Sequence, residues 1–554
     1  MVLPSIATLV AIVVIFGALF GVLRRPWTAG GLTAYTLGFV LLNSFVKQAY
    51  LGLAMTLADM RFFALRPAEN FTLFFRYPLL GLTLVGVFAG AALCVALGLR
   101  LERPVGALLR ARTGGALRIA IVAGAASVGV AASLLSGEES HARVDDGDAF
   151  VAFKIMYEQQ HPQGPIGRLN LFFNNRSFDA RLPQRREQSR FVASGVGGDA
   201  ASVVLPDIAL VLQESTFDPT LIRQCPRAAC DVRMLHPAQS ATRTQQGPLL
   251  VHTTGGGTWL AEFSVMSGLD WRIFGRGGAY APVSLAPRLR ESLPKRMRAI
   301  GYRTVALYPT DGNFLSGQSA YGYYGFEEFY DAKDLALPED WQDVNDALIL
   351  NKALQIAQRH DDGRPLFIFM LTVRNHGPHG GNLASLAESG REVADKTNEA
   401  LADYLARMRA SSRDYAVFSA RWLASSRPRV VAWFGDHQPE AAWDFTEDVK
   451  LLDAVRLPDN LHGGQFRGDQ YKFLTQYQFS ANFGEREQRV ARDALDISYL
   501  YAELSAFAGL PLDGGALAAR TVRNACNGLM LDCADRALID DYLSYRIYDL
   551  RSVE

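Results

Sequence analysis

The sequence predicts an N-terminal α-helical transmembrane bundle followed by an extracytoplasmic α/β domain with a mainly parallel sheet. Two patterns carry this prediction. Long apolar runs gather before residue 137, and short apolar runs of strand length alternate with helix-like segments after Pro206. The chain has 554 residues, of which 49% are hydrophobic, and its mean hydropathy of +0.05 is high for a purely soluble protein.

The N-terminal part contains four apolar runs, each close to the roughly 20 residues that a spanning helix needs. They cover residues 3–22, 31–55, 79–99 and 119–135. Four such runs together favour membrane helices over buried helices of a soluble protein. The first run is predicted to stay in the mature protein, because no basic segment precedes it and no small-residue cleavage site stands out.

The arginines predict the orientation of these helices. Arg24 and Arg25 follow the first run, and five arginines lie at residues 100–118 after the third. Both loops are expected in the cytoplasm, because cytoplasmic loops are enriched in Lys and Arg. The N-terminus and everything after about Gly137 then lie outside. The chain is therefore expected to be a multi-pass membrane protein whose large polar portion is periplasmic or extracellular.

The balanced charge of 56 basic and 56 acidic residues gives no global reason to expect a nucleic-acid partner. The cysteines agree with an oxidising compartment. Cys94 lies in the third apolar run, and the other four form two local pairs, Cys225 with Cys230 and Cys526 with Cys533. Disulfides are favoured over zinc ligation or free thiols, because the intervals exceed a C-x2-C knuckle and no histidine is suitably spaced.

Polar side chains follow three of the predicted strands at the points where they end. Glu214 follows the strand at 208–212, His376 comes shortly after the strand at 366–371, and Asp436 and His437 follow the strand at 430–434. A fourth strand is expected at 304–307. Because ligands gather at the carboxyl ends of parallel strands, these side chains are expected in one cleft.

Three glycines precede Thr258, and the segment that follows reads as a helix. Converging backbone N–H groups and a helix N-terminus both favour an anion such as phosphate. The segment does not match the nucleotide P-loop, which needs a Lys-Ser/Thr after its last glycine. A flexible glycine turn without chemistry is the alternative for this segment taken alone.

Together, Glu214, Thr258, Asp436 and His437 supply two carboxylates, a hydroxyl and an imidazole. This set suits one divalent ion, Mn²⁺ or Zn²⁺, better than Ca²⁺, and Mg²⁺ is also compatible. A threonine hydroxyl is a poor nucleophile at neutral pH. Coordination lowers its pKa and fixes its direction of attack, so Thr258 is predicted to be the nucleophile.

In their order, these motifs resemble the lipoteichoic-acid-synthase-like branch of the sulfatase/alkaline-phosphatase superfamily, over roughly residues 206–509. The matching residues are Glu214-Ser215, Gly257-Thr258 with Glu262-Phe263, Asn375-His376-Gly377-Pro378 and Phe434-Gly435-Asp436-His437-Gln438-Pro439. Each motif is modest alone, and the ordered set is specific. The resemblance implies an alkaline-phosphatase/sulfatase-like fold.

The resemblance also implies a metal held by Glu214, Thr258, Asp436 and His437. Thr258 would attack the phosphodiester of a phospholipid, either phosphatidylglycerol or phosphatidylethanolamine. The headgroup would then pass from a phospho-threonine to a glycan or lipid acceptor. His376 would contact the phosphoryl group or protonate a leaving oxygen, with a structural strand-end histidine as the alternative. Further expected substrate contacts are Trp259, Arg374 and His462.

The chain departs from the resemblance at Gly317, where phosphoglycerol-transferring members often carry an arginine at the headgroup. The headgroup, phosphoglycerol or phosphoethanolamine, is therefore left open. A phosphodiesterase or sulfatase-type hydrolase with water as acceptor is the first alternative. A non-catalytic membrane sensor that keeps the fold is the second.

Four regions are predicted on this basis. Residues 1–137 form the transmembrane domain, and residues 138–205 form a linker. A segment at 149–156 is expected to be a helix lying against the membrane or the catalytic domain, with an ordinary packed helix equally compatible. Residues 206–510 form the sulfatase-like catalytic domain, and residues 511–554 are its C-terminal extension.

Overall fold

The computed structural model describes residues 4–51, 54–57, 59–60, 78–102, 162, 164–173, 182–186, 189–191, 204–222, 230–238, 240–338, 344–360, 362–380, 399–439, 473–491, 493–531 and 533–554. The chain forms two compact units. One comprises residues 1–146 and 151–179, and the other comprises residues 147–150 and 180–554.

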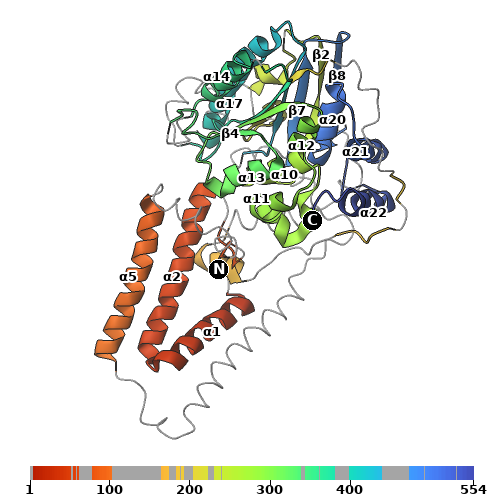
Figure 1. Cartoon of the computed structure of the whole chain (residues 1–554). Helices are drawn as coiled ribbons and strands as arrows, with labels where there is room; N and C mark the ends of the chain where they lie inside the picture. The colour runs from red at the N-terminus through yellow and green to blue at the C-terminus, as the bar shows by residue number, and fades with distance from the viewer. Residues whose placement is uncertain are drawn as a thin grey trace. The chain divides into compact units, whose positions relative to one another are not determined.

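The first unit is helical (Figure 1). Its described helices are α1 (Ile6–Leu23), α2 (Pro26–Leu51), α5 (Pro78–Leu101) and α8 (Gly164–Phe173). Ser5 caps the start of α1 by accepting from the backbone N–H of Thr8, and Arg24 ends the helix in the left-handed conformation at φ 55°. Pro26 then opens α2, a position where its missing N–H is not needed.

Two described helices are long and apolar enough to cross a membrane, covering Ile6–Leu23 and Pro26–Gln48. They correspond to the first two predicted runs. The third predicted run falls within α5, of which Phe88–Leu101 qualifies as a shorter apolar helix. The fourth run at 119–135 and the segment at 149–156 lie outside the described residues.

The second unit is built on a nine-stranded sheet in the order β4-β3-β5-β1-β6-β7-β2-β8, with β9 paired to β2. The strands are β1 (Asp207–Gln213), β2 (Arg243–Leu250), β3 (Arg303–Leu307), β4 (Glu328–Tyr330), β5 (Leu366–Leu371), β6 (Arg429–Gly435), β7 (Leu474–Ala481), β8 (Glu487–Val490) and β9 (Leu495–Asp496). All pairs are parallel except those that β7 makes with β6 and β2. The predicted α/β fold with a mainly parallel sheet is therefore confirmed, and the four predicted strands are the neighbours β3, β5, β1 and β6.

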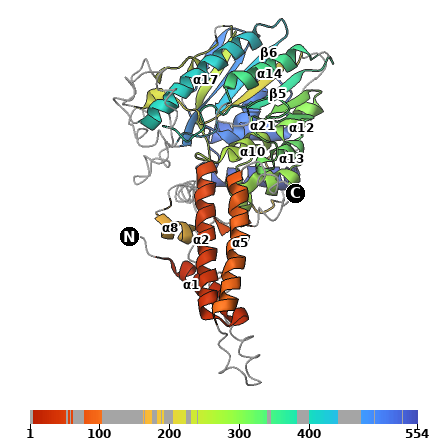
Figure 2. The same ribbon diagram turned by 90° about the vertical axis from the view of Figure 1, so that its left-hand side faces the viewer.

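Helices cover both faces of the sheet (Figure 2). On one face, α14 (Asp346–Gln358) and α17 (Glu399–Leu423) pack on the central strands and form the largest part of the apolar core with them. The other face carries α10 (Thr258–Ser267), α12 (Leu293–Ala299), α20 (Leu500–Phe507) and α21 (Gly514–Ala525). Strands that are buried on both faces consist of continuous apolar residues. This is why the sequence predicted the four strands β3, β5, β1 and β6.

Shorter elements and the C-terminal helices complete this unit. They are η1 (Pro219–Leu221), η2 (Arg233–Leu235), η3 (Trp271–Tyr280), α11 (Ala281–Ser284), η4 (Ala286–Arg288), η5 (Phe314–Ser316), α13 (Gly317–Tyr324), η10 (Ile497–Tyr499), α22 (Arg536–Ser544) and η11 (Tyr545–Asp549).

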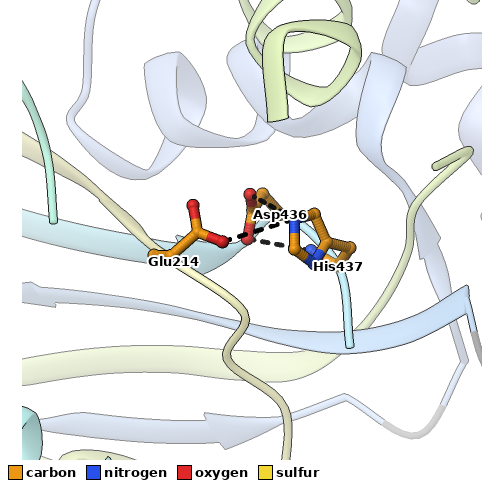
Figure 3. Close-up of side chains that lie close together, drawn as sticks. All are labelled: Glu214, Asp436 and His437. Atoms are coloured by element: carbon orange, nitrogen blue, oxygen red, sulfur yellow. Dashed lines mark hydrogen bonds and ion pairs between the residues drawn. The ribbon is translucent and has the colours of Figure 1, made fainter. Parts of the chain in front are cut away.

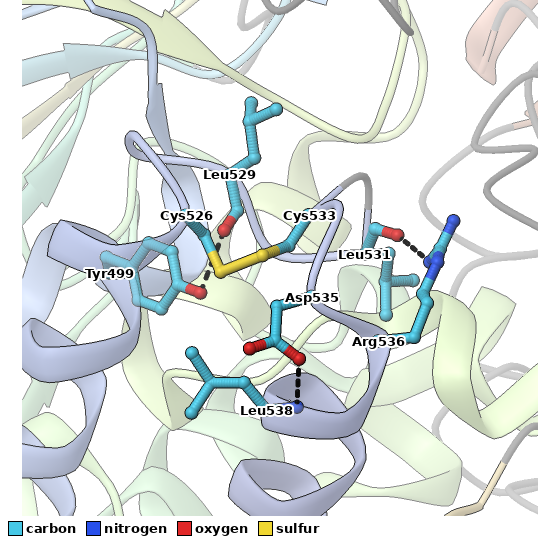
Figure 4. Close-up of a disulfide and its surroundings, with 8 residues drawn as sticks. All are labelled: Tyr499, Cys526, Leu529, Leu531, Cys533, Asp535, Arg536 and Leu538. Atoms are coloured by element: carbon cyan, nitrogen blue, oxygen red, sulfur yellow. Dashed lines mark hydrogen bonds between the residues drawn. A yellow bond between two sulfur atoms is a disulfide. The ribbon is translucent and has the colours of Figure 1, made fainter.

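A disulfide joins Cys526 and Cys533 between α21 and α22, as the sequence predicted (Figure 4). Leu529 lies in the loop that this disulfide closes, and its carbonyl accepts from the hydroxyl of Tyr499 at 3.0 Å. Cys230 is also disulfide-bonded, and its predicted partner Cys225 lies outside the described residues.

Candidate functional site

Two neighbouring parallel strands place the acidic residues of the site. Gln213, the last residue of β1, pairs in register with Gly435, the last residue of β6. Glu214 and Asp436 therefore follow their strands at the same level of the sheet edge. No side chain is tolerated at Gly435, because a Cβ there would lie 1.8 Å from the backbone oxygen of Thr216.

The side chains of Glu214, Asp436 and His437 point toward one another (Figure 3). Nε2 of His437 lies 3.4 Å from Oε1 of Glu214 and 3.2 Å from Oδ2 of Asp436. All three residues are buried, with at most 2% of each exposed. Burial and, second, the charge of Asp436 raise the pKa of Glu214 to about 8.

The hydrogen bonds around His437 fix which of its nitrogens faces the carboxylates. Its Nδ1 lies 3.2 Å from the carbonyl oxygen of Gln438, which can only accept a hydrogen bond. With the proton on Nδ1, the lone pair of Nε2 faces the carboxylates. Oδ1 of Asp436 accepts from the backbone N–H groups of Ser215 and His437, at 2.8 and 3.0 Å, whereas its buried Oδ2 accepts no hydrogen bond from any described residue.

Three acceptor atoms, Nε2 of His437, Oε1 of Glu214 and Oδ2 of Asp436, thus converge in a buried place, and of these Oε1 also accepts from the hydroxyl of Ser215 at 2.8 Å. Such an arrangement is unfavourable unless a proton or a cation sits among the ligands. The donor set of one imidazole nitrogen and carboxylate oxygens fits Zn²⁺ or Mn²⁺. The Nδ1 contact to a carbonyl is the outer hydrogen bond that orients metal-binding histidines.

Thr258 is the first residue of α10, directly after the glycine loop. Gly256 has φ 80°, and a Cβ on Gly257 would lie 1.9 Å from Oγ1 of Thr253, so both positions need glycine. The hydroxyl of Thr258 donates to Oε2 of Glu214 at 3.3 Å and lies 3.4 Å from Nε2 of His437. The structure therefore brings together all four residues of the predicted metal set.

His376 lies in the loop that follows β5. Its Nδ1 contacts the carbonyl of Gly377 at 2.6 Å, and Arg407 holds the loop by donating to the carbonyl of His376 at 3.1 Å. Burial lowers the pKa of His376, whereas the charge of Asp436 acts in the opposite direction. Because its pKa lies below the ordinary value of 6.5, His376 is a neutral imidazole at pH 7.

The other predicted substrate contacts are Trp259, Arg374 and His462. The indole N–H of Trp259 donates to the carbonyl of Ala279 at 2.9 Å, and Trp259 is buried. The guanidinium of Arg374 donates to the side chain of Asn345. His462 lies outside the described residues.

A second buried cluster lies beneath the glycine loop. Nε2 of His252 is 2.8 Å from Oδ2 of Asp496, and Nδ1 is 3.3 Å from Oδ2 of Asp270. Arg272 already binds Asp270 through two guanidinium nitrogens. These contacts join His252, Asp270, Asp496 and Arg272 in one buried network that holds the loop.

The sequence shows His252 beside the glycines but gives no signal for its two aspartate partners. A further buried acid, Glu262, follows Thr258 by one helical turn and accepts from the hydroxyl of Tyr321 at 2.8 Å. Burial raises the pKa of Glu262 to about 7.

Comparisons with known proteins identify a family and several similar chains. Residues 207–481 match the sulfatase family. An uncharacterized protein of Haemophilus influenzae is 25% identical over 393 residues, which cover 69% of this chain and 67% of that relative. A putative cyclic β-1,2-glucan modification protein of Rhizobium meliloti is 22% identical over 243 residues, 42% of this chain and 36% of the relative, so this chain spans about a third of its length.

Among solved structures, the Streptococcus pyogenes phosphoglycerol transferase GacH in complex with sn-glycerol-1-phosphate is similar with a TM-score of 0.47. The two are 16% identical over 62% of this chain and 86% of the other. The family match spans strands β1 to β7 and includes Glu214, Thr258, Asp436 and His437. The α/β domain of this chain, with its alkaline-phosphatase/sulfatase-like fold, belongs to the sulfatase family.

Proposed function

We propose that the protein is a membrane-anchored, metal-dependent transferase that moves a phospholipid headgroup through a phospho-Thr258 intermediate to a periplasmic glycan or lipid. The observation that carries the proposal is the position of the Thr258 hydroxyl, 3.3 Å from Glu214 and 3.4 Å from His437 at the buried cluster. The two apolar N-terminal helices support an anchor in the bacterial inner membrane, and the four predicted runs support a multi-pass one.

Glu214, Thr258, Asp436 and His437 would hold the divalent ion. When bound, the ion would lower the pKa of the Thr258 hydroxyl and offset the charge of the phosphate. Because the hydroxyl of Thr258 donates to Oε2 of Glu214, this carboxylate is the nearest acceptor for the proton that leaves on attack. The start of α10 directs backbone N–H groups toward the phosphate oxygens.

In the first half-reaction, Oγ1 of Thr258 attacks phosphorus and the bond from phosphorus to the diacylglycerol oxygen breaks. Diacylglycerol leaves with the electron pair and takes up a proton, which His376 would supply. In the second half-reaction, an acceptor hydroxyl attacks phosphorus, the bond from phosphorus to Oγ1 of Thr258 breaks, and the proton of the acceptor hydroxyl passes to Oγ1. The resemblance to phosphoglycerol and phosphoethanolamine transferases supports phosphatidylglycerol or phosphatidylethanolamine as donor.

The similarity to a putative cyclic β-1,2-glucan modification protein supports a glycan acceptor. A lipid donor also explains an anchor, because each buried CH₂ holds the donor in the bilayer by about 0.8 kcal/mol. Arg374, Trp259 and His462 are proposed as further contacts to the donor.

The proposal is tested by the intact mass of the full-length protein after exposure to each phospholipid without an acceptor. The expected result is the mass of glycerol phosphate or ethanolamine phosphate added at Thr258 and absent in Thr258→Ala. No added mass with either lipid would contradict the covalent mechanism. Diacylglycerol release from a labelled lipid that does not depend on added glycan would favour a hydrolase instead.

A further inference from the structure

Arg168 is a buried cation in the helical unit. It lies on α8 with 7% of its surface exposed, and its guanidinium stacks over the ring of Phe45 at 3.7 Å. Its Nη1 makes two long contacts of 3.4 Å with the backbone oxygen and the hydroxyl of Ser44. Buried Nε has no hydrogen-bond partner, and Nη2 has none among the described residues.

No described acidic residue pairs with this guanidinium. Lys47 of α2, by contrast, has a carboxylate partner, because its Nζ lies 2.8 Å from Oδ1 of Asp59. An unpaired buried charge is strongly unfavourable, so a buried arginine without a carboxylate calls for another anion. The edge formed by Nε and Nη2 is the planar fork that binds carboxylate or phosphate through two hydrogen bonds.

The position of Arg168 along the helices indicates which anion. Helices α1 and α2 are joined by two residues, so the start of α1 and the end of α2 lie at the same end of the pair. Helix α8 lies beside α2, below the end of that helix (Figure 2), and contacts α1 as well, where Oδ1 of Asn170 accepts from the backbone N–H of Ser5 and the hydroxyl of Thr8, each at 2.8 Å. Ser5 directly precedes the apolar span Ile6–Leu23, so Asn170 and with it α8 lie at the start of this span, near the headgroup layer when α1 crosses a membrane.

We propose that Arg168, stacked on Phe45, binds the phosphate of an anionic phospholipid at the end of the α1–α2 pair. The lipid phosphate would occupy the Nε and Nη2 edge and supply the missing counter-charge. This site rests on the proposed membrane anchorage and is separate from the Thr258 cluster. It would fasten the helical unit to a lipid of the same chemical class as the proposed donor.

The test uses the full-length protein in nanodiscs of a phosphate-free galactolipid with rising amounts of phosphatidylglycerol. Bound phospholipid is counted by native mass spectrometry, and Tm is followed in parallel. We expect tight phosphatidylglycerol binding with a rise in Tm for the wild type, and about 10- to 100-fold weaker binding for Arg168→Met. Arg24→Asn, which removes a charge at the opposite end of the pair, is the matched control and should bind like the wild type.

Without phosphatidylglycerol, Arg168→Met should unfold at the same or a higher temperature than the wild type, because it removes an unpaired buried charge. A Tm that falls equally in both kinds of nanodisc would instead make Arg168 a structural residue and overturn the site. Unchanged lipid binding in Arg168→Met would overturn it as well. Should this variant not fold, Arg168→Lys keeps the charge without the fork and must still weaken binding.

Two further measurements distinguish a lipid phosphate from a free phosphate, and the Arg168 site from the Thr258 cluster. Soluble glycerol phosphate in galactolipid nanodiscs should leave Tm unchanged, and an equal rise would assign the site to a free phosphate instead of a lipid. Thr258→Ala should keep the full phosphatidylglycerol response. Loss of the response in Thr258→Ala alone would place the lipid at the catalytic cluster and contradict a site at Arg168.

Discussion

The guanidinium of Arg546 donates to the backbone carbonyl of Ser267 at 2.7 Å, at the end of the helix that begins with Thr258. Through Nη1 it also donates to the carbonyl of Gly268 at 3.3 Å and to the hydroxyl of Tyr542 at 2.9 Å. Arg546 is fully buried. A cation at this end satisfies the last carbonyls of α10 and opposes the helix dipole, so the C-terminal segment stabilises the nucleophile helix.

Arg546→Met is therefore expected to lower the free energy of unfolding by about 3 kcal/mol, because two buried carbonyls lose a charged donor. Chemical denaturation of the full-length protein in detergent, followed by tryptophan fluorescence, measures the loss. Arg551→Met is the control, since Arg551 is exposed and close in sequence. Equal stability of the two variants would show that Arg546 does not hold α10.

Removal of metal should lower the stability of the α/β domain. A ligand at 100 times its dissociation constant stabilises the folded state by about 2.7 kcal/mol, so a chelator is expected to lower Tm by several degrees. Adding Mn²⁺ or Zn²⁺ should restore Tm in the wild type and leave Asp436→Asn unchanged. Asp270→Asn, in the neighbouring ion network, is the control, and a metal response that depends on Asp270 instead of Asp436 would relocate the site.

The metal-free protein should lose stability as pH rises through about 8. The pKa of Glu214 is about 8 in the folded protein against its ordinary value of 4.5, so the folded state holds a proton that the unfolded state has released. The stabilising effect is complete below pH 4.5 and disappears as pH rises through 8. Urea denaturation between pH 5 and 9 with chelator measures this slope.

Glu214→Gln should flatten the slope, because the amide cannot ionise. Bound metal should flatten it too, since the ion replaces the proton, and metal uptake at pH 7 should release protons to an unbuffered solution. An unchanged slope in Glu214→Gln would assign the pH dependence to another group.

The strands and the metal set were predictable because their signals are local. Apolar runs such as Leu366–Leu371 are buried on both faces, and Glu214 and Asp436 directly follow strands whose ends are in register. Because ligands bind at the carboxyl ends of parallel strands, Glu214 and Asp436 could be assigned to one site although they are more than 200 positions apart in the sequence. Thr258 could be assigned to the same site because three glycines precede it, and such a glycine loop is typical of a backbone that binds an anion.

Side-chain direction in loops was not predictable in the same way. Arg374 follows the predicted strand at β5, but its side chain turns to Asn345, whose position depends on how α14 packs. The role of residues 511–554 was also hidden, because Arg546 acts on carbonyls 278 and 279 positions earlier in the chain. Such partners are set by tertiary packing alone.

The same reasoning applies to His252, whose partner Asp496 is 244 positions away. His252→Gln leaves buried Asp496 without its imidazole partner, and is expected to lower the free energy of unfolding by about 1 to 3 kcal/mol. Asp496→Asn alone should also destabilise, because the buried imidazole loses one of its two carboxylate neighbours. If the two side chains interact directly, the double variant loses clearly less than the sum of the single variants, with a coupling of about 1 to 3 kcal/mol. Additive losses in this double-mutant cycle would mean that the 2.8 Å contact does not hold the glycine loop.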